Sequence, residues 1–389
     1  MAKLYPAGGR SKPPLARAPQ VRYNGVMRIV SVRARPWTLP LVAPFVIAAR
    51  RAHDARNVRV HVETEAGGGG VGASCPVGYV TGESVESVED ALMSVGPRFE
   101  GQATDRLQPL LTLAADLLHD APAARAGLEM ALYDAWARHW HQPLWQHFGG
   151  AFSRVTTDLT IPLVSLEEAA TLAQTAWAEG FRSLKIKVGD PEGYAADLAR
   201  IEVIVRTVPG VRLRIDANQA FAPDEAVTFA RALLATGATI DLLEQPVAAD
   251  DVAGLKYVRE RAGMPVFADE AARTVREVQR LLREDAVDGV NVKLMKSGIG
   301  GALEIIALCR ASGKKLMLGC MLETGLGIAA AAQIAAGTGA FDYLDLDSHR
   351  LLRPVPGLSG GFAVDGEDLV VGADGEAGWG VTVPPEEMP

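Results

Sequence analysis

The middle and end of the chain repeat one pattern, in which a short apolar run is followed by an amphipathic or alanine-rich stretch. The apolar runs predict eight strands, at Thr156–Ile161, Ser183–Val188, Arg212–Ile215, Thr239–Leu243, Val266–Ala268, Gly289–Val292, Lys315–Leu318 and Tyr343–Leu346. The stretches between them predict seven helices, at Leu166–Glu179, Tyr194–Thr207, Asp224–Thr236, Val252–Arg261, Thr274–Glu284, Gly301–Ser312 and Leu326–Gly337. This alternation is typical of an α/β fold and predicts a (β/α)7β TIM-type barrel.

The region before the barrel carries a different pattern. Residues Met27–Arg35 and Asn57–Glu65 alternate polar and apolar positions, as half-buried strands do. We interpret Pro40–Phe45 as a turn-bounded connector and the glycine-rich Ala66–Gly72 as a hairpin loop or mobile flap. Three helices are predicted next, at Ser87–Phe99, Leu107–His119 and Ala121–His139.

These patterns divide the chain into four parts. Residues 1–26 lack the apolar core of a signal peptide, so we expect a disordered leader, or an upstream start ahead of Met27. Residues 27–150 are predicted to form an α+β capping domain and residues 151–350 the barrel. Residues 351–389 are glycine- and acid-rich and are expected to return to the capping domain, which N-terminal and C-terminal segments would then build together.

Composition narrows the class of protein. The net charge of −8 and the lack of a basic stripe argue against nucleic-acid binding. No apolar run reaches the roughly 18 residues of a membrane helix, so no membrane partner is expected. Three widely spaced cysteines make a disulfide framework improbable and favour a reducing compartment, so we expect a cytoplasmic protein.

Three acidic residues follow consecutive predicted strands. Asp216, Glu244 and Asp269 each come at the end of an apolar run, so their carboxylates should converge at one edge of the barrel mouth. Such carboxylates repel one another unless a cation holds them, and oxygen ligands without His or Cys favour Mg²⁺, or Mn²⁺. Three solvated surface acids would not explain one acid at each step of the barrel. The sequence therefore predicts one metal ion per site.

Lysines occupy two further strand ends. Lys185 and Lys187 are two residues apart on the second strand and share a face, while Lys293 ends the sixth strand, on the opposite side of the barrel. Opposed bases across one carbon are what an inversion of configuration requires. A nearby like charge and a cation would lower a lysine pKa and make it a usable base. We interpret Lys296, in the following loop, as solvated.

Five motifs together resemble the enolase superfamily, and within it the muconate-lactonizing subgroup. They are KIKVG, RIDANQAF, LLEQP, FADE and NVKLMKSGIGG, and the resemblance covers nearly the whole chain from Met27 onward. It implies that the three carboxylates bind Mg²⁺, which stabilises an ene-diolate formed when a carbon next to a carboxylate loses its proton. It also implies that Lys187 and Lys293 are the acid/base pair and that Lys185 helps to stabilise the enolate.

The resemblance also assigns supporting residues. Asn218 and Glu270 would orient metal ligands or bases. The segment Gly319–Thr324, GCMLET, is similar to the strand-seven segment of dipeptide epimerases, and its Glu323 is assigned the same supporting role. Members of the superfamily share the first half-reaction and differ afterwards, so these residues alone do not give the reaction.

The eighth strand separates the alternatives. Asp345 and Asp347 share one face of that strand, and an Asp-x-Asp here resembles dipeptide epimerases, where it holds the α-ammonium of the substrate. An acidic pair that only forms a turn is the simpler interpretation of the two residues taken alone. The next residues, Ser348–Arg350, depart from the pattern of that group, so the resemblance does not predict which residues form this wall of the pocket.

Specificity is predicted from a segment before the barrel. Pro40–Arg50 resembles the capping loop of the family, and Arg50 matches the position of an arginine that binds the glutamate side chain in Ala-Glu epimerases. A solvated loop arginine is the alternative. Thr160 and Ile161, at the end of the first strand, are expected to line the pocket near the dipeptide backbone.

Three functions remain after these observations. The first is Mg²⁺-dependent epimerisation of a dipeptide, with L-Ala-D/L-Glu as one substrate. The second is another reaction of the subgroup, namely N-acylamino-acid racemisation, o-succinylbenzoate synthesis or muconate cycloisomerisation, whose substrates lack a free ammonium for Asp345 and Asp347. The third is a non-catalytic barrel, which would not need three lysines beside a metal. Because the subgroup is commonly oligomeric, we also expect a homo-oligomer.

Overall fold

The structure is a computed structural model that describes residues 27–48, 50–65, 68–372 and 375–384. The predicted leader, residues 1–26, lies outside the described residues. Among the residues described, no helix combines the length and the apolar character needed to cross a membrane. The division of the chain at residues 150 and 350 stays a prediction.

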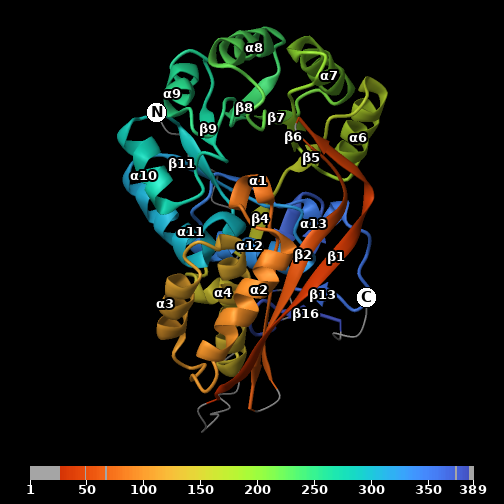
Figure 1. The fold of residues 1–389 in the computed structure, drawn as a ribbon. Coiled ribbons are helices and arrows are strands. Elements are labelled where there is room, and N and C mark those ends of the chain that lie inside the picture. The colour runs from red at the N-terminus through yellow and green to blue at the C-terminus, as the bar shows by residue number, and fades with distance from the viewer. Residues whose placement is uncertain (1–26, 49, 66–67, 373–374, 385–389) are drawn as a thin grey trace, which may run out of the picture.

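The centre of the molecule is a nearly closed parallel barrel (Figure 1). Its strands follow chain order: β5 (Leu159–Ile161), β6 (Ser183–Lys187), β7 (Arg212–Asp216), β8 (Thr239–Glu244), β9 (Val266–Ala268), β10 (Gly289–Val292), β11 (Lys315–Gly319) and β12 (Tyr343–Asp345). The helices between them are α6 (Leu166–Ala178), α7 (Tyr194–Thr207), α8 (Pro223–Ala235), α9 (Val252–Arg259), α10 (Val275–Arg283), α11 (Leu294–Ala311) and α12 (Gly325–Thr338). The predicted (β/α)7β barrel is confirmed.

Local sequence explains where two of these helices begin. The Ser165 side chain accepts a hydrogen bond from the Glu168 amide before α6, and the Glu168 side chain accepts one from the Ser165 amide. Thr274 and Glu277 make the same reciprocal pair before α10. Each pair satisfies amides that the first turn of a helix leaves without a partner.

The capping domain packs an antiparallel sheet against helices. The sheet contains β1 (Ile29–Ile47), β2 (Arg50–Thr64) and β3 (Gly69–Ser74). The helices are α1 (Gly78–Thr81), α2 (Val85–Val95), a short 3₁₀ helix (Gly96–Arg98), α3 (Leu107–Leu117), α4 (Pro122–His139) and α5 (Leu144–His147). Figure 1 shows the long hairpin of β1 and β2 running from this domain to the barrel, where the Leu163 amide donates to the Val46 carbonyl over 3.0 Å. The predicted α+β cap is confirmed.

Two predictions in this domain were wrong. Pro40–Phe45 is not a connector, because β1 continues through it with a shift of register between Pro40 and Phe45. The glycine-rich stretch is not only a loop, since β3 begins at Gly69. A Cβ on Gly70 would lie 2.0 Å from the Ala131 carbonyl oxygen of α4. The glycine there allows the strand to approach the helix closely, and such a position cannot be distinguished from a turn by composition.

The start and end of the barrel also differ from the prediction. The predicted strand Thr156–Ile161 is two strands, because β4 (Arg154–Thr156) pairs outside the barrel with β15 (Asp368–Val370). Only β5 belongs to the barrel. After β12, a short helix α13 (Ser348–Leu351) forms where none was predicted.

The C-terminal segment contacts the capping domain, as predicted. Trp379 is fully buried, and its ring Nε1–H and backbone N–H donate to the Met130 carbonyl and the Asp134 carboxylate of α4, each over 2.9 Å. The strands of the segment do not join the sheet of that domain. Instead, β13 (Ser359–Gly360) pairs with β16 (Val381–Thr382), and β14 (Ala363–Asp365) pairs with β15.

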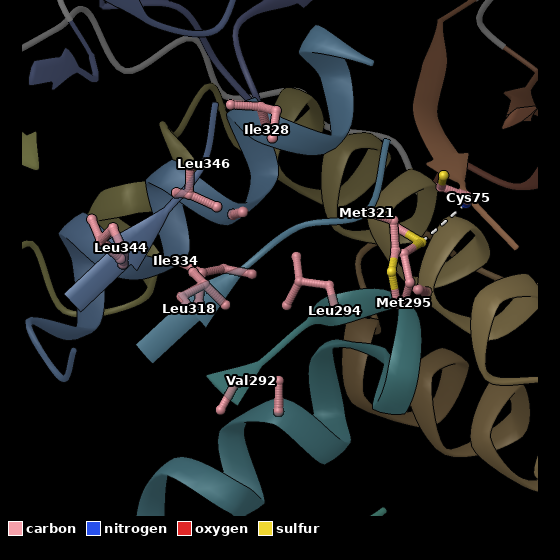
Figure 2. Packing of buried hydrophobic residues seen from close by; sticks show 14 of the residues in the cluster. Cys75, Val292, Leu294, Met295, Leu318, Met321, Ile328, Ile334, Leu344 and Leu346 are labelled. Carbon is pink, nitrogen blue, oxygen red and sulfur yellow. Dashed lines mark hydrogen bonds between the residues drawn. The ribbon is translucent and has the colours of Figure 1, made fainter. Parts of the chain in front are cut away.

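A continuous apolar core connects the barrel with its outer helices and the capping domain. Figure 2 shows part of it, where Leu318 of β11 and Leu344 of β12 lie among side chains of α12, including Ile334. At one end of this region, Met295 reaches Cys75, which follows β3 of the capping domain. The core therefore fixes the capping domain beside the C-terminal ends of the barrel strands.

Candidate active site

Three carboxylates converge at the mouth of the barrel. Asp216 and Glu244 are the last residues of β7 and β8, and Asp269 follows β9 directly. All three are buried, and one oxygen of each lies within 4.8 Å of the others. Because the strands are parallel neighbours, their C-terminal ends meet at one edge and bring the acids together.

Neighbouring groups hold one oxygen of each of the first two carboxylates. Asp216 Oδ1 accepts a hydrogen bond from the backbone N–H of Asn218 over 3.0 Å, and Glu244 Oε1 accepts one from the side-chain Nδ2 of Asn291 over 2.6 Å. The opposite oxygens, Asp216 Oδ2 and Glu244 Oε2, therefore remain directed toward the site. Asn291 was not predicted, although it lies two residues before Lys293 and alternation along the strand places both on one face.

Lys296 holds the third carboxylate, and our prediction that it is solvated was wrong. Its side chain is 2% exposed, and Nζ donates to Asp269 Oδ1 over 2.8 Å and to the carbonyls of Asp269 and Asn291 over 2.7 Å each. Lys296 does not lie in a loop, because α11 begins at Leu294 and its first turn carries the side chain back over the strand ends. A lysine three residues after Lys293 in an apolar run is the signal that could have found it.

The carboxylate oxygens Asp216 Oδ2, Glu244 Oε2 and Asp269 Oδ2 suit a divalent cation, although each has a lysine ammonium group within 3.0 Å. Burial, and next the charge of Asp216, raise the pKa of Glu244 to about 7. A cation bound by the oxygens would compensate both the burial and the repulsion. An all-oxygen set without histidine or cysteine matches Mg²⁺ or Mn²⁺.

Lys185 lies at the centre of the charged network. Its side chain is 1% exposed, and Nζ lies 3.0 Å from Asp216 Oδ2, 2.9 Å from Glu244 Oε2 and 2.6 Å from Asp345 Oδ2. Lys185 therefore connects two of the candidate metal ligands with the acidic residue at the end of the eighth barrel strand.

Lys187 and Lys293 approach the carboxylates from different strands. Lys187 Nζ lies 2.6 Å from Asp216 Oδ2, and Lys293 Nζ lies 2.8 Å from Asp269 Oδ2. Lys187 ends β6 and Lys293 follows β10, and these strands are four apart in the eight-stranded order. Both line the cavity at the barrel mouth. The structure thus places two ammonium groups on opposite sides of one cavity, as the sequence predicted.

The lysine pKa values differ from the expectation. Burial lowers the pKa of Lys185 and of Lys293, but carboxylates outweigh it, Asp216 foremost for the first and Asp269 for the second. Both pKa values are therefore raised above the ordinary lysine value. The protein side chains alone therefore favour the ammonium forms of both lysines. The predicted lowering of the pKa was wrong for them, because the neighbouring carboxylates outweigh the neighbouring lysines.

Asp345 and Asp347 face the same cavity, but only Asp345 belongs to the eighth strand, because β12 ends there and Asp347 is the N-cap of α13. The Thr160 amide donates to Asp347 Oδ2 over 2.6 Å, and Thr160 Oγ1 donates to Asp345 Oδ1 over 3.4 Å. Burial, followed by the charge of Asp345, raises the pKa of Asp347 to about 6. For Asp345 burial acts in the same direction, but Lys185 and Lys187 hold its pKa below the ordinary value. Thr160 lines the cavity and also holds both aspartates.

The predicted supporting residues divide into two groups. Asn218 Nδ2 donates to Glu270 Oε1 over 3.1 Å beside the three converging carboxylates. Burial, and then the charge of Asp269, raise the pKa of Glu270 to about 7. Glu323 stands apart, since its Oε1 accepts the Met321 amide over 3.0 Å and burial raises its pKa to about 7.

The capping domain supplies the outer wall of the cavity. Arg50 is exposed and lines the cavity from the start of β2, and Tyr79 of α1 lies on the same wall. Burial raises the pKa of the Tyr79 phenol to about 12, against the opposing charges of Lys293 and Arg50. Tyr79 was not predicted, because only the docking of the two domains brings α1 to the barrel mouth.

The chain matches two family models and is similar to known proteins over most of its length. Residues 28–149 match the family "Mandelate racemase / muconate lactonizing enzyme, N-terminal domain", and residues 168–387 match "Enolase C-terminal domain-like". The chain is 38% identical to the L-Ala-D/L-Glu epimerase of Bacillus subtilis over 91% of this chain and 97% of that one. It is 36% identical to the aromatic dipeptide epimerase of Herpetosiphon aurantiacus over 88% of this chain and 95% of that one.

Solved structures agree with the sequence comparisons. The Bacillus subtilis epimerase in a substrate-liganded complex superposes with a TM-score of 0.87, 37% identity and coverage of 92% and 100% of the two chains. The Enterococcus faecalis dipeptide epimerase complexed with Mg and L-Leu-L-Tyr has a TM-score of 0.86 and 34% identity, and the match covers 92% of this chain and 100% of that one. An N-succinyl Arg/Lys racemase from Bacillus cereus has a TM-score of 0.86 and 26% identity, with coverage of 92% and 96% of the two chains. The chain belongs to the mandelate racemase/muconate lactonizing enzyme family of the enolase superfamily.

Proposed function

We propose that the protein is an isomerase that epimerises dipeptides at the α-carbon of the C-terminal residue. The observation that carries this proposal is one cavity lined by two opposed lysines, a buried acidic pair and Asp269, the member of the carboxylate triad that reaches its surface. The dipeptide epimerases to which the chain is similar support it.

Asp216, Glu244 and Asp269 would hold one Mg²⁺, with Mn²⁺ as a substitute, and the convergence of three buried carboxylates supports this assignment. The cation, when bound, supplies a Lewis acid for the carboxylate of the substrate and lowers the pKa of nearby lysines. One oxygen of each ligand would be kept fixed by a hydrogen bond: Asp216 by the backbone N–H of Asn218, Glu244 by Asn291 and Asp269 by Lys296. Glu270 would in turn hold the side chain of Asn218.

The lysines would move the proton. One of Lys187 and Lys293 removes the α-proton, and the other returns a proton to the opposite face of the same carbon, which inverts its configuration. Lys185 stays protonated beside the carboxylates and stabilises the negative charge that develops on the substrate carboxylate. Their positions at the C-terminal ends of β6 and β10, facing one cavity, support this two-base division.

Asp345 and Asp347 would bind the α-ammonium of the dipeptide. Their carboxylates are buried and held by Thr160, so a cationic group would meet a fixed partner. This feature favours a dipeptide over muconate or o-succinylbenzoate precursors. N-acylamino-acid racemisation stays the second candidate, because the likeness to the N-succinyl Arg/Lys racemase supports it, although an acylated nitrogen would leave the acidic pair without a cation.

The side chain of the C-terminal residue would face the capping domain. Arg50 lines the cavity there, and its guanidinium suits the carboxylate of a glutamate side chain, so L-Ala-D/L-Glu is the proposed substrate. Glu323 is assigned a supporting role beside Met321, which lines the cavity, and not a contact to the metal.

One experiment tests the proposal. The protein is incubated with Mg²⁺ and a panel of dipeptides in D₂O, and NMR follows the α-proton of each residue. Deuterium should enter the α-position of the C-terminal residue. Exchange with N-succinyl amino acids and with no dipeptide would replace the proposal with N-acylamino-acid racemisation.

We also propose that the protein acts on this small molecule in the cytoplasm and assembles as a homo-oligomer. All three cysteines of the chain are free thiols, which supports a reducing compartment. The proposal of a homo-oligomer is based on the common oligomerisation of the subgroup. Light scattering of the purified protein tests it by measuring the molar mass.

A further inference from the structure

One short segment connects the catalytic lysine with the capping domain. Residues 293–300, here called the lysine segment, begin with Lys293, whose Nζ lies 2.8 Å from Asp269 Oδ2. They also contain Lys296, which donates to Asp269 Oδ1 over 2.8 Å. Both oxygens of Asp269 are therefore contacted by lysines from this segment. Its position fixes one base and one metal ligand together.

The segment contains a break in helix α11. Gly298 has φ 67° and ψ 176°, so α11 is two helical pieces joined by a kink. The second piece begins with the amides of Ile299 and Gly300. The first amides of a helix have no partner within the helix and are stabilised by a carboxylate.

Glu129 of the capping domain supplies that carboxylate. Its Oε2 accepts the Ile299 amide over 2.5 Å and the Gly300 amide over 3.1 Å, and its side chain is 2% exposed. A Cβ on Gly298 would lie 2.8 Å from the same oxygen, so the kink and the carboxylate fit one another closely. Arg125 Nε lies 3.7 Å from Glu129 Oε1 and balances its charge.

A second contact with the capping domain lies in the same segment. The amide of Cys75, which follows β3, donates to Met295 Sδ over 3.1 Å (Figure 2). The lysine segment is thus held at Met295 and at its C-terminal end by groups from the capping domain, and helices α4 and α11 pack against each other around it.

We propose that Glu129 is a positioning residue for Lys293. By holding the Ile299 and Gly300 amides, it keeps the lysine segment in place and so keeps Lys293 directed at the α-carbon of the substrate. Lys187 ends β6 and belongs to a different wall of the barrel, so Glu129 acts on one of the two bases only. The inference rests on the proposed epimerisation, which it extends to a residue of α4.

A purely structural role for Glu129 is the alternative, and α4 offers a matched control. Asp134 is also a buried carboxylate of α4 beside an arginine, and it accepts the amides of Val71 and Trp379 over 3.0 and 2.9 Å. Those amides belong to the capping domain and the C-terminal segment. A substitution at Asp134 therefore costs stability without touching the lysine segment.

The test compares Glu129→Ala with Asp134→Ala, and uses Lys293→Ala to identify the stereoisomer that Lys187 deprotonates. With Mg²⁺ in D₂O, Glu129→Ala should lower α-proton exchange from the Lys293-dependent isomer at least about fivefold more than from the other isomer. Asp134→Ala should lower both isomers alike. Glu129→Gln keeps an acceptor oxygen but loses the charge, so the ratio of the two isomers' exchange rates should change less than in Glu129→Ala, by about twofold. An unchanged ratio in Glu129→Ala would overturn the proposal.

Two further measurements keep the test decisive. If Glu129→Ala does not fold, the comparison passes to Glu129→Gln and Asp134→Asn, where a ratio shift of about twofold or more is expected only for the first. Hydrogen–deuterium exchange of peptides covering residues 293–300 should be faster in the Glu129 variants than in the Asp134 variants. This readout needs no substrate, so it separates failure of this inference from failure of the proposed function.

Discussion

The two walls of the cavity differ in how firmly their side chains are held. On the barrel wall, Lys293 and Asp269 are buried, and Lys293 Nζ lies 2.8 Å from Asp269 Oδ2. On the capping wall, Tyr79 is 50% exposed and Arg50 is exposed. A fixed wall suits chemistry, which depends on exact distances, and an exposed wall can vary its contacts with different substrates.

The largest effect is expected from the barrel wall. Lys293→Ala should lower epimerisation by about 10²–10⁴-fold, because one of two bases is lost. Exchange of the α-proton should persist from one stereoisomer through Lys187. Chiral chromatography of the product and NMR in D₂O measure the two quantities. Equal exchange from both stereoisomers would contradict the two-base mechanism.

The acidic pair should show the next largest effect. Asp347→Asn should raise KM for dipeptides by about 30-fold, since removal of one partner of a buried charge pair costs 2 kcal/mol or more. Mg²⁺ affinity, measured by calorimetry, should change little, because Asp347 is not one of the three converging carboxylates. If KM and the Mg²⁺ dissociation constant rise by the same factor, Asp347 does not have the proposed role.

The same residue predicts a dependence on pH. The pKa of Asp347 is raised to about 6, so the carboxylate is charged above that pH and protonated below it. The kcat/KM for dipeptides should therefore fall up to about tenfold per unit as the pH decreases through 6. Measurements between pH 5 and 8 on wild type and Asp347→Asn check this, since the variant should lose that limb of the profile.

The smallest effect is expected from the capping wall. Arg50→Ala should raise KM for Ala-Glu by about two- to fivefold, because an ion pair at an exposed position contributes only about 0.2–1 kcal/mol. KM for Ala-Ala, which has no second carboxylate, serves as the control and should not change. A larger loss with Ala-Ala than with Ala-Glu would remove Arg50 from the list of specificity residues and weaken the comparison of the two walls.

The sequence predicted the barrel wall better than the capping wall, for a physical reason. Asp216 and Glu244 end their strands, so local apolar runs already determine where they lie. Lys296 was misinterpreted because its burial depends on Asp269, which lies on another strand. Tyr79 carries no local signal at all, since its place depends on how two domains dock.

The glycines of the capping domain show the same limit. Gly70 and Gly72 suggested a flexible loop, yet they lie in β3 because the carbonyls of Ala131 and Gly127 on α4 leave no room for a Cβ. Composition reports that a position needs a small residue. It does not report whether flexibility or close contact is the reason.

Thr160 lies at the seam between the first and last strands of the barrel. The Asp158 amide donates to the Leu344 carbonyl over 3.2 Å, and nearer the mouth the side chains of Asp345 and Asp347 continue the connection to Thr160. A substrate ammonium on these aspartates would add a cross-link to the seam. Because the substrate would bind only the barrel in which this seam is closed, it would raise the free energy needed to separate the first and last strands. The barrel with substrate bound would therefore open less readily than the barrel without it.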